Sequence, residues 1–292
     1  MTCQEPRVEF LLNEADTCRK YVVPLLQAAG WDNEPHSIAE QRTFTDGRIV
    51  PQGAAAKRRP GKRVDYLLRF TRDFPLAVVE AKAHYKIAGH GLQQAKEYAE
   101  ILGLKFAYAT NGQGIVEFDY STGSETELTG FPTPDQLWAR LREAERLEDD
   151  TTAERLLTPA NLTTGKEPRY YQRVAIQRVV QALLQGRRRL LVTMATGTGK
   201  TLVAFQICWM LWSSRWNRTG EHRKPRILYL ADRNFLVDDP KDKIFAPFGD
   251  ARHKIEGEAV KSREMYFAIY QAIARDERRP GLYKDYSRAI AW

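Results

Sequence analysis

The sequence has few cysteines and no long hydrophobic run. Its three cysteines, Cys3, Cys18 and Cys208, are scattered and odd in number, which indicates neither a disulfide framework nor a cysteine-based zinc site. No apolar stretch approaches the ~18 residues that a membrane-spanning helix needs, and no signal peptide opens the chain. These absences predict a soluble, cytoplasmic protein of a reducing compartment with no membrane partner.

Internal repeats and low-complexity tracts are also absent. The chain has 292 residues, of which 43% are hydrophobic and 11% aromatic, and this predicts two globular domains. Its net charge of +8 is unevenly distributed: residues 1–150 carry 19 basic and 23 acidic side chains, whereas residues 151–292 carry 26 and 14. A basic second half is expected where a domain follows a phosphate backbone, although net charge also serves solubility.

Hydrophobic periodicity predicts an α/β fold with two different sheets. Over residues 1–120 we expect a mixed sheet flanked by helices at 8–29 and 88–103, with strands at 42–50, 63–70, 76–82, 105–110 and 114–119. Residues 121–165 are patterned more loosely, with a charged helix that ends in E-A-E-R-L-E-D-D, and are expected to form a linker. Over 166–292 strands alternate with helices, which is typical of a parallel sheet, with strands expected at 189–194, 226–231 and 265–270 and helices at 170–185, 199–214 and 233–238.

The run A-V-V-E-A-K-A-H at 77–84 ends a predicted strand with Glu80 and Lys82 on one face. Asp65 lies in the preceding strand, and two carboxylates on adjacent strands can share one Mg²⁺, because hard cations select oxygen ligands. The metal would polarise a phosphodiester, and Lys82 would orient or help deprotonate a water and stabilise the developing charge. The alternative to a metal site is a surface salt bridge at the end of a strand. If only Asp65, Glu80 and Lys82 are considered, the salt bridge is the preferred interpretation.

Three further side chains are candidates for the same site. Gln94 and Tyr98 fall at i and i+4 on one helix face. Glu14 falls in register with an apolar stripe, where a buried acid needs a partner or a metal ion. At the edge of the stripe its carboxylate would instead reach water, and both interpretations of Glu14 stay open.

The segment L-L-V-T-M-A-T-G-T-G-K-T at 190–201 has the pattern of a phosphate-binding loop between a strand and a helix. Lys200 is expected to reach the β- and γ-phosphates of ATP, and Thr201 to ligate Mg²⁺. Met194 stands where the common pattern has its first glycine. The other residues that we expect to bind the nucleotide here are Thr196, Gly197, Thr198 and Gly199.

These motifs resemble those of known families. The spacing of Asp65 to Glu80-x-Lys82 resembles the PD-(D/E)xK nuclease superfamily, and Gln94-x-x-x-Tyr98 resembles an element of some of its members. A-T-G-T-G-K-T resembles motif I of superfamily 2 helicases, in which a glutamine before the loop reads adenine; that role falls to Gln172 in R-Y-Y-Q. The order of these motifs resembles the N-terminal part of the restriction (R) subunit of type I restriction-modification enzymes.

The resemblance implies an activity and partners. It implies a restriction-endonuclease-like domain followed by a RecA-like motor domain, with Mg²⁺-dependent cleavage of double-stranded DNA coupled to ATP-driven translocation. It also implies a complex with modification and specificity subunits. No Walker B acid follows an apolar strand, since Asp276 and Glu277 lack one, so we expect a motor domain that is incomplete and a chain that is a fragment.

Two alternatives remain open from the sequence. The chain could be a stand-alone helicase-like, DNA-dependent ATPase with an inactive nuclease-like appendage. It could also be a truncated fragment that binds DNA and ATP without catalysis, since a Walker B acid and a second motor domain are missing from the sequence given.

Overall fold

The structure, a computed structural model, describes residues 13–44, 49–52, 55–58, 61–147, 149–163, 165, 167–217, 220–221, 223–256, 260 and 262–273. The chain divides into two compact units, residues 1–146 and 147–292. None of the helices in these described ranges is both long and apolar enough to cross a membrane.

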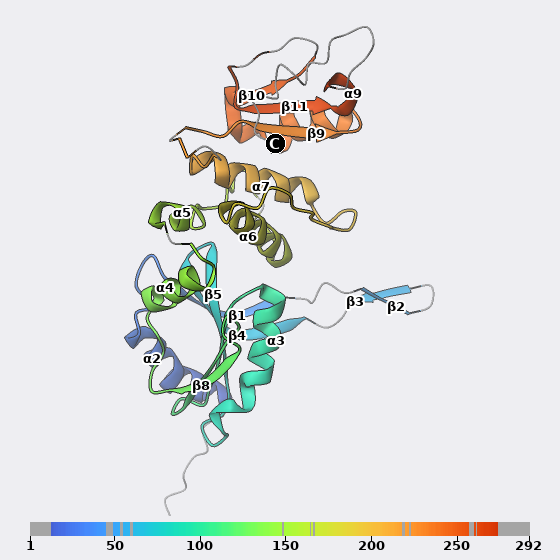
Figure 1. Ribbon diagram of the computed structural model, residues 1–292. Helices are drawn as coiled ribbons and strands as arrows, with labels where there is room; N and C mark the ends of the chain where they lie inside the picture. The colour runs from blue at the N-terminus through green and yellow to red at the C-terminus, as the bar shows by residue number, and fades with distance from the viewer. Residues whose placement is uncertain are drawn as a thin grey trace, which may run out of the picture. The chain divides into compact units, whose positions relative to one another are not determined.

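The first unit, blue to green in Figure 1, contains a six-stranded mixed sheet, and its strands lie in the order β1-β4-β5-β6-β7-β8. Its strands are β1 (Ser37–Phe44), β4 (Lys62–Thr71), β5 (Phe74–Ala81), β6 (Phe106–Thr110), β7 (Ile115–Asp119) and β8 (Ser124–Leu128), and a separate pair is formed by β2 (Ile49–Gln52) and β3 (Ala55–Arg58). Its helical elements are α1 (Glu14–Thr17), η1 (Cys18–Val22), α2 (Val23–Ala28), η2 (Ala88–Gly91), α3 (Leu92–Leu102) and α4 (Pro134–Ala144).

Within the six-stranded sheet, β5 and β6 are parallel and every other neighbouring pair is antiparallel. A parallel pair needs a crossover connection, which η2 and α3 supply. Ala109 of β6 packs with Leu92 of α3, whereas Phe106 lies beneath the guanidinium of Arg140 from α4. Since side chains three positions apart on a strand point to opposite faces, α3 and α4 cover opposite faces of the sheet.

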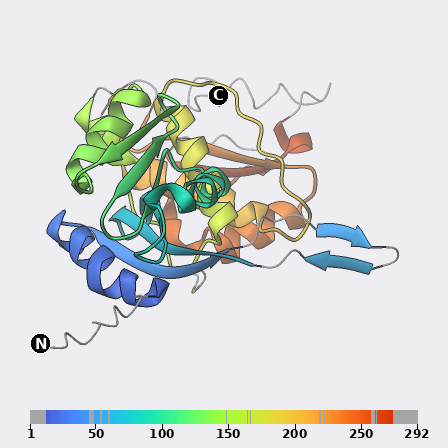
Figure 2. The same ribbon diagram turned by 90° about the horizontal axis from the view of Figure 1, so that it is seen from below.

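The N-terminal helix, blue in Figure 2, contains one wide turn, η1. The amide of Val23 bonds the carbonyl of Cys18, five residues back, because Pro24 has no N–H to continue the α-helical ladder. Gly30 follows the helix with a φ of 90°, as expected for a C-terminal stop. Residues 8–12 of the predicted helix lie outside the described ranges.

The linker predicted to start at residue 121 is wrong in its first half. β8 pairs with β7, and α4 is fixed by Trp138, whose ring stacks on Phe70 at 5.1 Å. Arg140 donates hydrogen bonds to the buried carboxylates of Glu117 and Asp119. These anchors are single residues in a loosely patterned stretch, so periodicity did not indicate that the first unit extends to residue 146.

The second unit contains a parallel three-stranded sheet in the order β10-β11-β9. Its elements are α5 (Asp150–Arg155), α6 (Tyr170–Leu184), α7 (Lys200–Ser213), β9 (Ile227–Ala231), α8 (Phe235–Asp239), η3 (Pro240–Ile244), η4 (Ala246–Ala251), β10 (Arg252–Lys254), β11 (Met265–Ile269) and α9 (Tyr270–Ile273). The predicted parallel pairing and the strands near 226–231 and 265–270 are confirmed. Asp276 and Glu277 lie outside the described residues.

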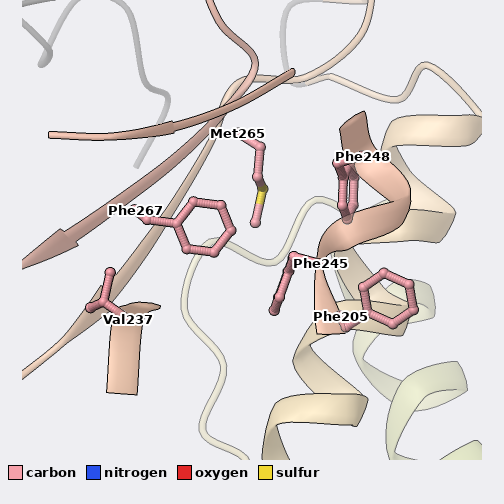
Figure 3. Close-up of a cluster of buried hydrophobic side chains, with 6 residues drawn as sticks. All are labelled: Phe205, Val237, Phe245, Phe248, Met265 and Phe267. Atoms are coloured by element: carbon pink, nitrogen blue, oxygen red, sulfur yellow. The ribbon is translucent and has the colours of Figure 1, made fainter. Parts of the chain in front are cut away.

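An aromatic cluster forms the core of the second unit (Figure 3). Phe205 of α7 meets Phe245 and Phe248 edge to face, at 5.4 and 5.9 Å between ring centroids. Phe267 of β11 packs on the other side of Phe245, at 5.3 Å. Fully buried aromatic pairs of this kind hold α7, and with it the loop from which α7 starts, against the sheet.

The predicted strand at 189–194 is wrong. Residues 187–195 form neither helix nor strand, and Leu191 is 92% exposed. A strand persists only where a neighbour satisfies its backbone groups, and within the described residues the sheet of this unit pairs only β10, β11 and β9. The segment thus has the apolar composition of a buried strand, but no neighbouring strand among the described residues pairs with it.

Candidate active site

Antiparallel pairing of β4 with β5 brings Asp65 and Glu80 together. The register pairs Tyr66 with Val79, so the next residues outward are Asp65 and Glu80. The Ala81 amide donates a 2.9 Å hydrogen bond to the Asp65 carboxylate, and the Asp65 amide lies 3.4 Å from Oε1 of Glu80. The two carboxylates predicted to share a metal ion are thus adjacent at one end of the sheet.

Glu80 is 1% exposed, which is unusual for a carboxylate. Burial, and next the negative charge of Asp65, raise the pKa of Glu80 to about 8, against the smaller opposing effects of Lys82 and of the Asp65 amide. A buried acid beside a second acid is an arrangement that a divalent cation would stabilise. The donor chemistry, two carboxylates from adjacent strands, fits Mg²⁺, for which proteins commonly supply only one or two carboxylates.

Lys82 connects the acids to the helix that follows. Its ammonium lies 3.8 Å from Oε2 of Glu80 and 3.3 Å from Oε1 of Gln94. The Gln94 amide nitrogen in turn donates a 2.9 Å hydrogen bond to the hydroxyl of Tyr98. The structure therefore brings Asp65 together with four of the five side chains predicted to accompany it, namely Glu80, Lys82, Gln94 and Tyr98.

Tyr98 is buried and held from two sides. Its ring meets Phe44 of β1 edge to face at 5.2 Å, and the ammonium of Lys62 lies 5.7 Å from the ring centroid. Because the ring is packed in this way, the hydroxyl that accepts from Gln94 has a fixed position. The Gln94–Tyr98 pair thus fixes the orientation of the glutamine oxygen toward Lys82.

Glu14 contacts Lys82 and does not take the position of a third metal ligand beside Asp65 and Glu80. Its carboxylate lies 3.9 Å from the ammonium of Lys82 and is about half exposed. Among the described residues, no three carboxylate, histidine or cysteine side chains gather as a metal-binding group. Of the two interpretations of Glu14, the geometry favours a partially solvated partner of Lys82.

Sequence reasoning missed Gly91, at the end of η2. A Cβ on this residue would lie 3.3 Å from Cβ of Glu80 and 3.3 Å from Cε of Lys82. The absence of a side chain thus allows the start of α3 to approach the carboxylate and the ammonium closely. The signal in the sequence was a glycine nine residues after the end of the predicted strand, directly before the observed start of α3, the helix that carries Gln94.

The phosphate-binding loop leads into α7 with two glycines in left-handed conformations, Gly197 at φ 78° and Gly199 at φ 84°. The Lys200 ammonium lies 3.1 and 3.2 Å from the carbonyl oxygens of Met194 and Ala195. The hydroxyl of Thr201 is hydrogen-bonded with Tyr229 of β9. Residues 196–199 thus form a turn that leads into α7 at Lys200, and the binding of phosphates by this loop stays a prediction.

Gln172 is buried against this loop. Its amide nitrogen donates to the Thr198 carbonyl at 2.8 Å, and its amide oxygen accepts from the Arg169 amide at 2.8 Å. A Cβ on Gly199 would collide with the Gln172 side chain, so the close approach requires glycine there. The structure thus connects Gln172 with the phosphate loop, and its predicted role in reading adenine stays a prediction.

These features define an α/β protein that joins a restriction-endonuclease-like mixed sheet to a RecA-like unit in which a glycine-rich loop leads into α7. Comparison with known proteins agrees. A family model described as "Type III restriction enzyme, res subunit" matches residues 165–289. The chain is 40% identical over 284 residues to the EcoAI endonuclease subunit, a type I restriction enzyme subunit of Escherichia coli, and 36% identical over 94 residues to the EcoKI endonuclease subunit of strain K12.

A solved structure extends this similarity to the fold. A fragment described as an HsdR subunit of a type I restriction enzyme from Vibrio vulnificus YJ016 shares 59% identity, with a TM-score of 0.82 over 95% of this chain and 50% of that one. The chain is a homologue of the endonuclease subunits of type I restriction enzymes. The match with the EcoAI subunit covers 94% of this chain but only 34% of that subunit. The match with the EcoKI subunit covers 32% of this chain and 7% of that subunit.

Proposed function

We propose that this chain contains the nuclease site and part of the motor of a type I restriction endonuclease subunit. In this proposal the first unit cleaves double-stranded DNA with Mg²⁺, and the second binds ATP to drive translocation. The observation that carries the proposal is the convergence of Asp65, Glu80 and Lys82 at one end of the sheet. The names of its relatives, which are subunits of type I restriction enzymes, support a place in a multi-subunit complex, and the family resemblance implies modification and specificity subunits as the partners.

In the proposed reaction, Asp65 and Glu80 would hold the metal ion. When bound, Mg²⁺ would supply a Lewis acid for the scissile phosphate and lower the pKa of a coordinated water. Lys82, held by Glu80 on one side and Gln94 on the other, is in position to stabilise the negative charge that develops on the phosphate oxygens. Glu14 would limit the positions open to the Lys82 ammonium.

In the second unit, the loop at 196–199 and the start of α7 would bind the phosphates of ATP. Lys200 would exchange its two carbonyl contacts for phosphate oxygens, and Thr201 would help to hold the Mg²⁺ that accompanies the nucleotide. Gln172 would hold the loop and read the adenine edge. These roles follow from the motif and from the contacts of Gln172 with the loop.

An inactive nuclease-like appendage is the less supported alternative. A surface salt bridge would leave Lys82 and Glu80 exposed, whereas Glu80 is buried and Lys82 contacts three side chains. Maintaining a buried acid next to another acid costs stability, which favours a functional reason for the pair.

The proposal is tested with the full-length subunit assembled with its partners. Asp65→Ala and Lys82→Ala are expected to abolish DNA cleavage while ATP hydrolysis continues, and Lys200→Ala is expected to abolish ATP hydrolysis. If both first-unit variants cut DNA at the wild-type rate, the assignment of the nuclease site is wrong.

A further inference from the structure

Two exposed apolar side chains lie in the loop that follows Lys82. Tyr85 is 61% exposed and Ile87 is 69% exposed. Among the residues of the first unit whose side-chain exposure the structure describes, 13–44 and 61–146, no other large hydrophobic side chain is exposed to more than about a third. All the others there contribute to the core or are partly covered, so the pairing of these two in one short loop calls for a physical reason.

The loop has a fixed backbone. The Lys86 amide donates to the Ala83 carbonyl at 2.8 Å, and the Asn111 side chain donates to the Lys86 carbonyl at 2.7 Å. The His84 amide bonds the buried hydroxyl of Thr17 at 3.0 Å. Tyr85 and Ile87 therefore alternate with two residues whose backbone is anchored, and the loop presents them to solvent in a defined position.

The ring of His84 gives the loop a second anchor. It stacks on the ring of Tyr21 with centroids 4.8 Å apart and an interplanar angle of 15°. Its Nδ1 lies 3.2 Å from the Asn111 carbonyl oxygen. His84 is thus held from the helix side and from the β6–β7 turn, which adds to the rigidity of the loop.

Both ends of the loop border the candidate nuclease site. Tyr85 and Ile87 follow Lys82 by three and five residues, and Gly91 at the far end lies against Glu80 and Lys82. Residues 81–96 contain three lysines, Lys82, Lys86 and Lys96, and no acidic residue. Lys86 is the charged residue within the loop, and no carboxylate of the loop would repel a DNA phosphate beside Tyr85 and Ile87.

We propose that Tyr85 and Ile87 contact double-stranded DNA beside the scissile phosphate, packing into a groove or against an opened base step, while Lys86 pairs with a neighbouring phosphate. This inference rests on the nuclease function proposed above. Apolar side chains inserted at base steps, next to basic residues that neutralise phosphates, are a known way of binding and bending a duplex. The contact would fix the cut phosphate relative to Lys82.

DNA is a better occupant of this loop than a protein subunit. Two side chains on one short loop offer a small contact, whereas stable protein interfaces bury on the order of 1,200 Å² or more. A short apolar contact next to a catalytic site is sufficient for DNA, because most of the affinity comes from phosphate contacts elsewhere.

The test uses the full-length subunit in its assembled complex, with the variants Tyr85→Ser and Ile87→Ser and their double variant. We expect the double variant to cut DNA at least about tenfold more slowly at limiting DNA, since stacking of one base on an aromatic ring alone corresponds to roughly 5- to 150-fold in affinity. ATP hydrolysis and Mn²⁺-dependent thermal stabilisation should stay at wild-type values. Tyr85→Phe and Ile87→Leu, which keep the apolar surface, are expected to retain cleavage.

The outcomes separate this inference from the proposed function. If Lys82→Ala abolishes cleavage and the serine variants cut normally, the inference about the loop is overturned and the nuclease site stands. If the serine variants instead fail to assemble with the other subunits, the loop contacts protein and the DNA contact is also overturned. If Lys82→Ala itself cuts normally, the nuclease proposal fails first.

Discussion

The ammonium of Lys82 lies 3.3 Å from the amide oxygen of Gln94, and the amide nitrogen of Gln94 donates a 2.9 Å hydrogen bond to the hydroxyl of Tyr98. A helix side chain, itself oriented by a buried tyrosine, thus fixes the lysine that faces the acids. The contact explains why a glutamine and a tyrosine one turn apart belong to the site.

The first prediction concerns this chain of contacts. Gln94→Ala should release Lys82 and lower the rate of DNA cleavage by about 10- to 100-fold, as for other side chains that orient a catalytic group. Tyr98→Phe should have a smaller effect in the same direction, because the ring stays packed. Cleavage assays on the assembled complex measure both.

The matched control for Gln94 is Gln93→Ala, an exposed neighbour on the same helix. Metal binding, followed by thermal stabilisation with Mn²⁺, should be unchanged in all three variants. Equal loss of cleavage in Gln93→Ala and Gln94→Ala would show that the orienting role is mistaken.

The second prediction concerns pH. The pKa of Glu80 is raised from its ordinary value of 4.5 to about 8, so between these pH values the folded protein keeps a proton that the unfolded chain releases. Without divalent metal, the stability of the first unit should therefore fall as pH rises from about 4.5 to 8, by on the order of a few kcal/mol. Denaturant unfolding across this pH range measures it.

Glu80→Gln should flatten this pH dependence, because the amide does not titrate. Addition of Mg²⁺ at pH 8 should raise the Tm of the wild-type protein more than that of Glu80→Gln. An identical pH slope in the two proteins would exclude Glu80 as its source.

The third prediction concerns the close approach of Gly91. Its backbone, at φ −88° and ψ −8°, is accessible to alanine, so a substitution acts through space alone. Gly91→Ala should press on Glu80 and Lys82, destabilise the first unit by about 1–3 kcal/mol as in other overpacked sites, and reduce cleavage. Thermal unfolding and cleavage rates measure the two effects.

Gly89→Ala is the control for Gly91. A Cβ there would meet only a methyl group of Val116, at an ordinary contact distance of 3.9 Å. It should leave both readouts near wild type. If Gly91→Ala behaves like Gly89→Ala, the local packing has room that the distances do not indicate.

The fourth prediction separates two roles of Gln172. If this side chain only holds the phosphate loop through the Thr198 carbonyl, Gln172→Ala should weaken ATP and GTP binding to the same extent. If it also reads adenine, as we propose, ATP binding should fall about tenfold while GTP binding changes less, which removes the preference between them. Competition with a fluorescent nucleotide measures both affinities in the full-length subunit.

The sequence predicted the site better than its surroundings. Asp65, Glu80 and Lys82 were found because strand alternation and adjacency are short-range rules, and Gln94 with Tyr98 because helix spacing is equally local. The structure brings these five side chains together, while their catalytic roles stay predictions. Gly91 was missed because its role depends on a distance through space that no periodicity encodes.

The errors at larger scale have a different cause. β8 and α4 were assigned to a linker. β8 is attached by its pairing with β7, and α4 is attached by contacts of Trp138 and Arg140 with side chains of β4 and β7. The run at 189–194 was assigned to a strand because its composition is apolar, yet strand formation depends on a neighbour that composition does not reveal. Local sequence patterns thus predicted which side chains lie close together along a strand or a helix. Contacts between distant segments decided which segments form strands and helices of the folded units.

The stretch from β4 through β5 to α3 has one more consequence. Asp65, Glu80, Lys82, Gln94 and Tyr98 all lie on a single uninterrupted stretch of chain within the first unit, so their mutual geometry is written into neighbouring secondary structure. In the function proposed above, the spacing among these atoms would therefore be independent of any movement of the second unit, and cleavage would be controlled by the delivery of DNA to the first unit.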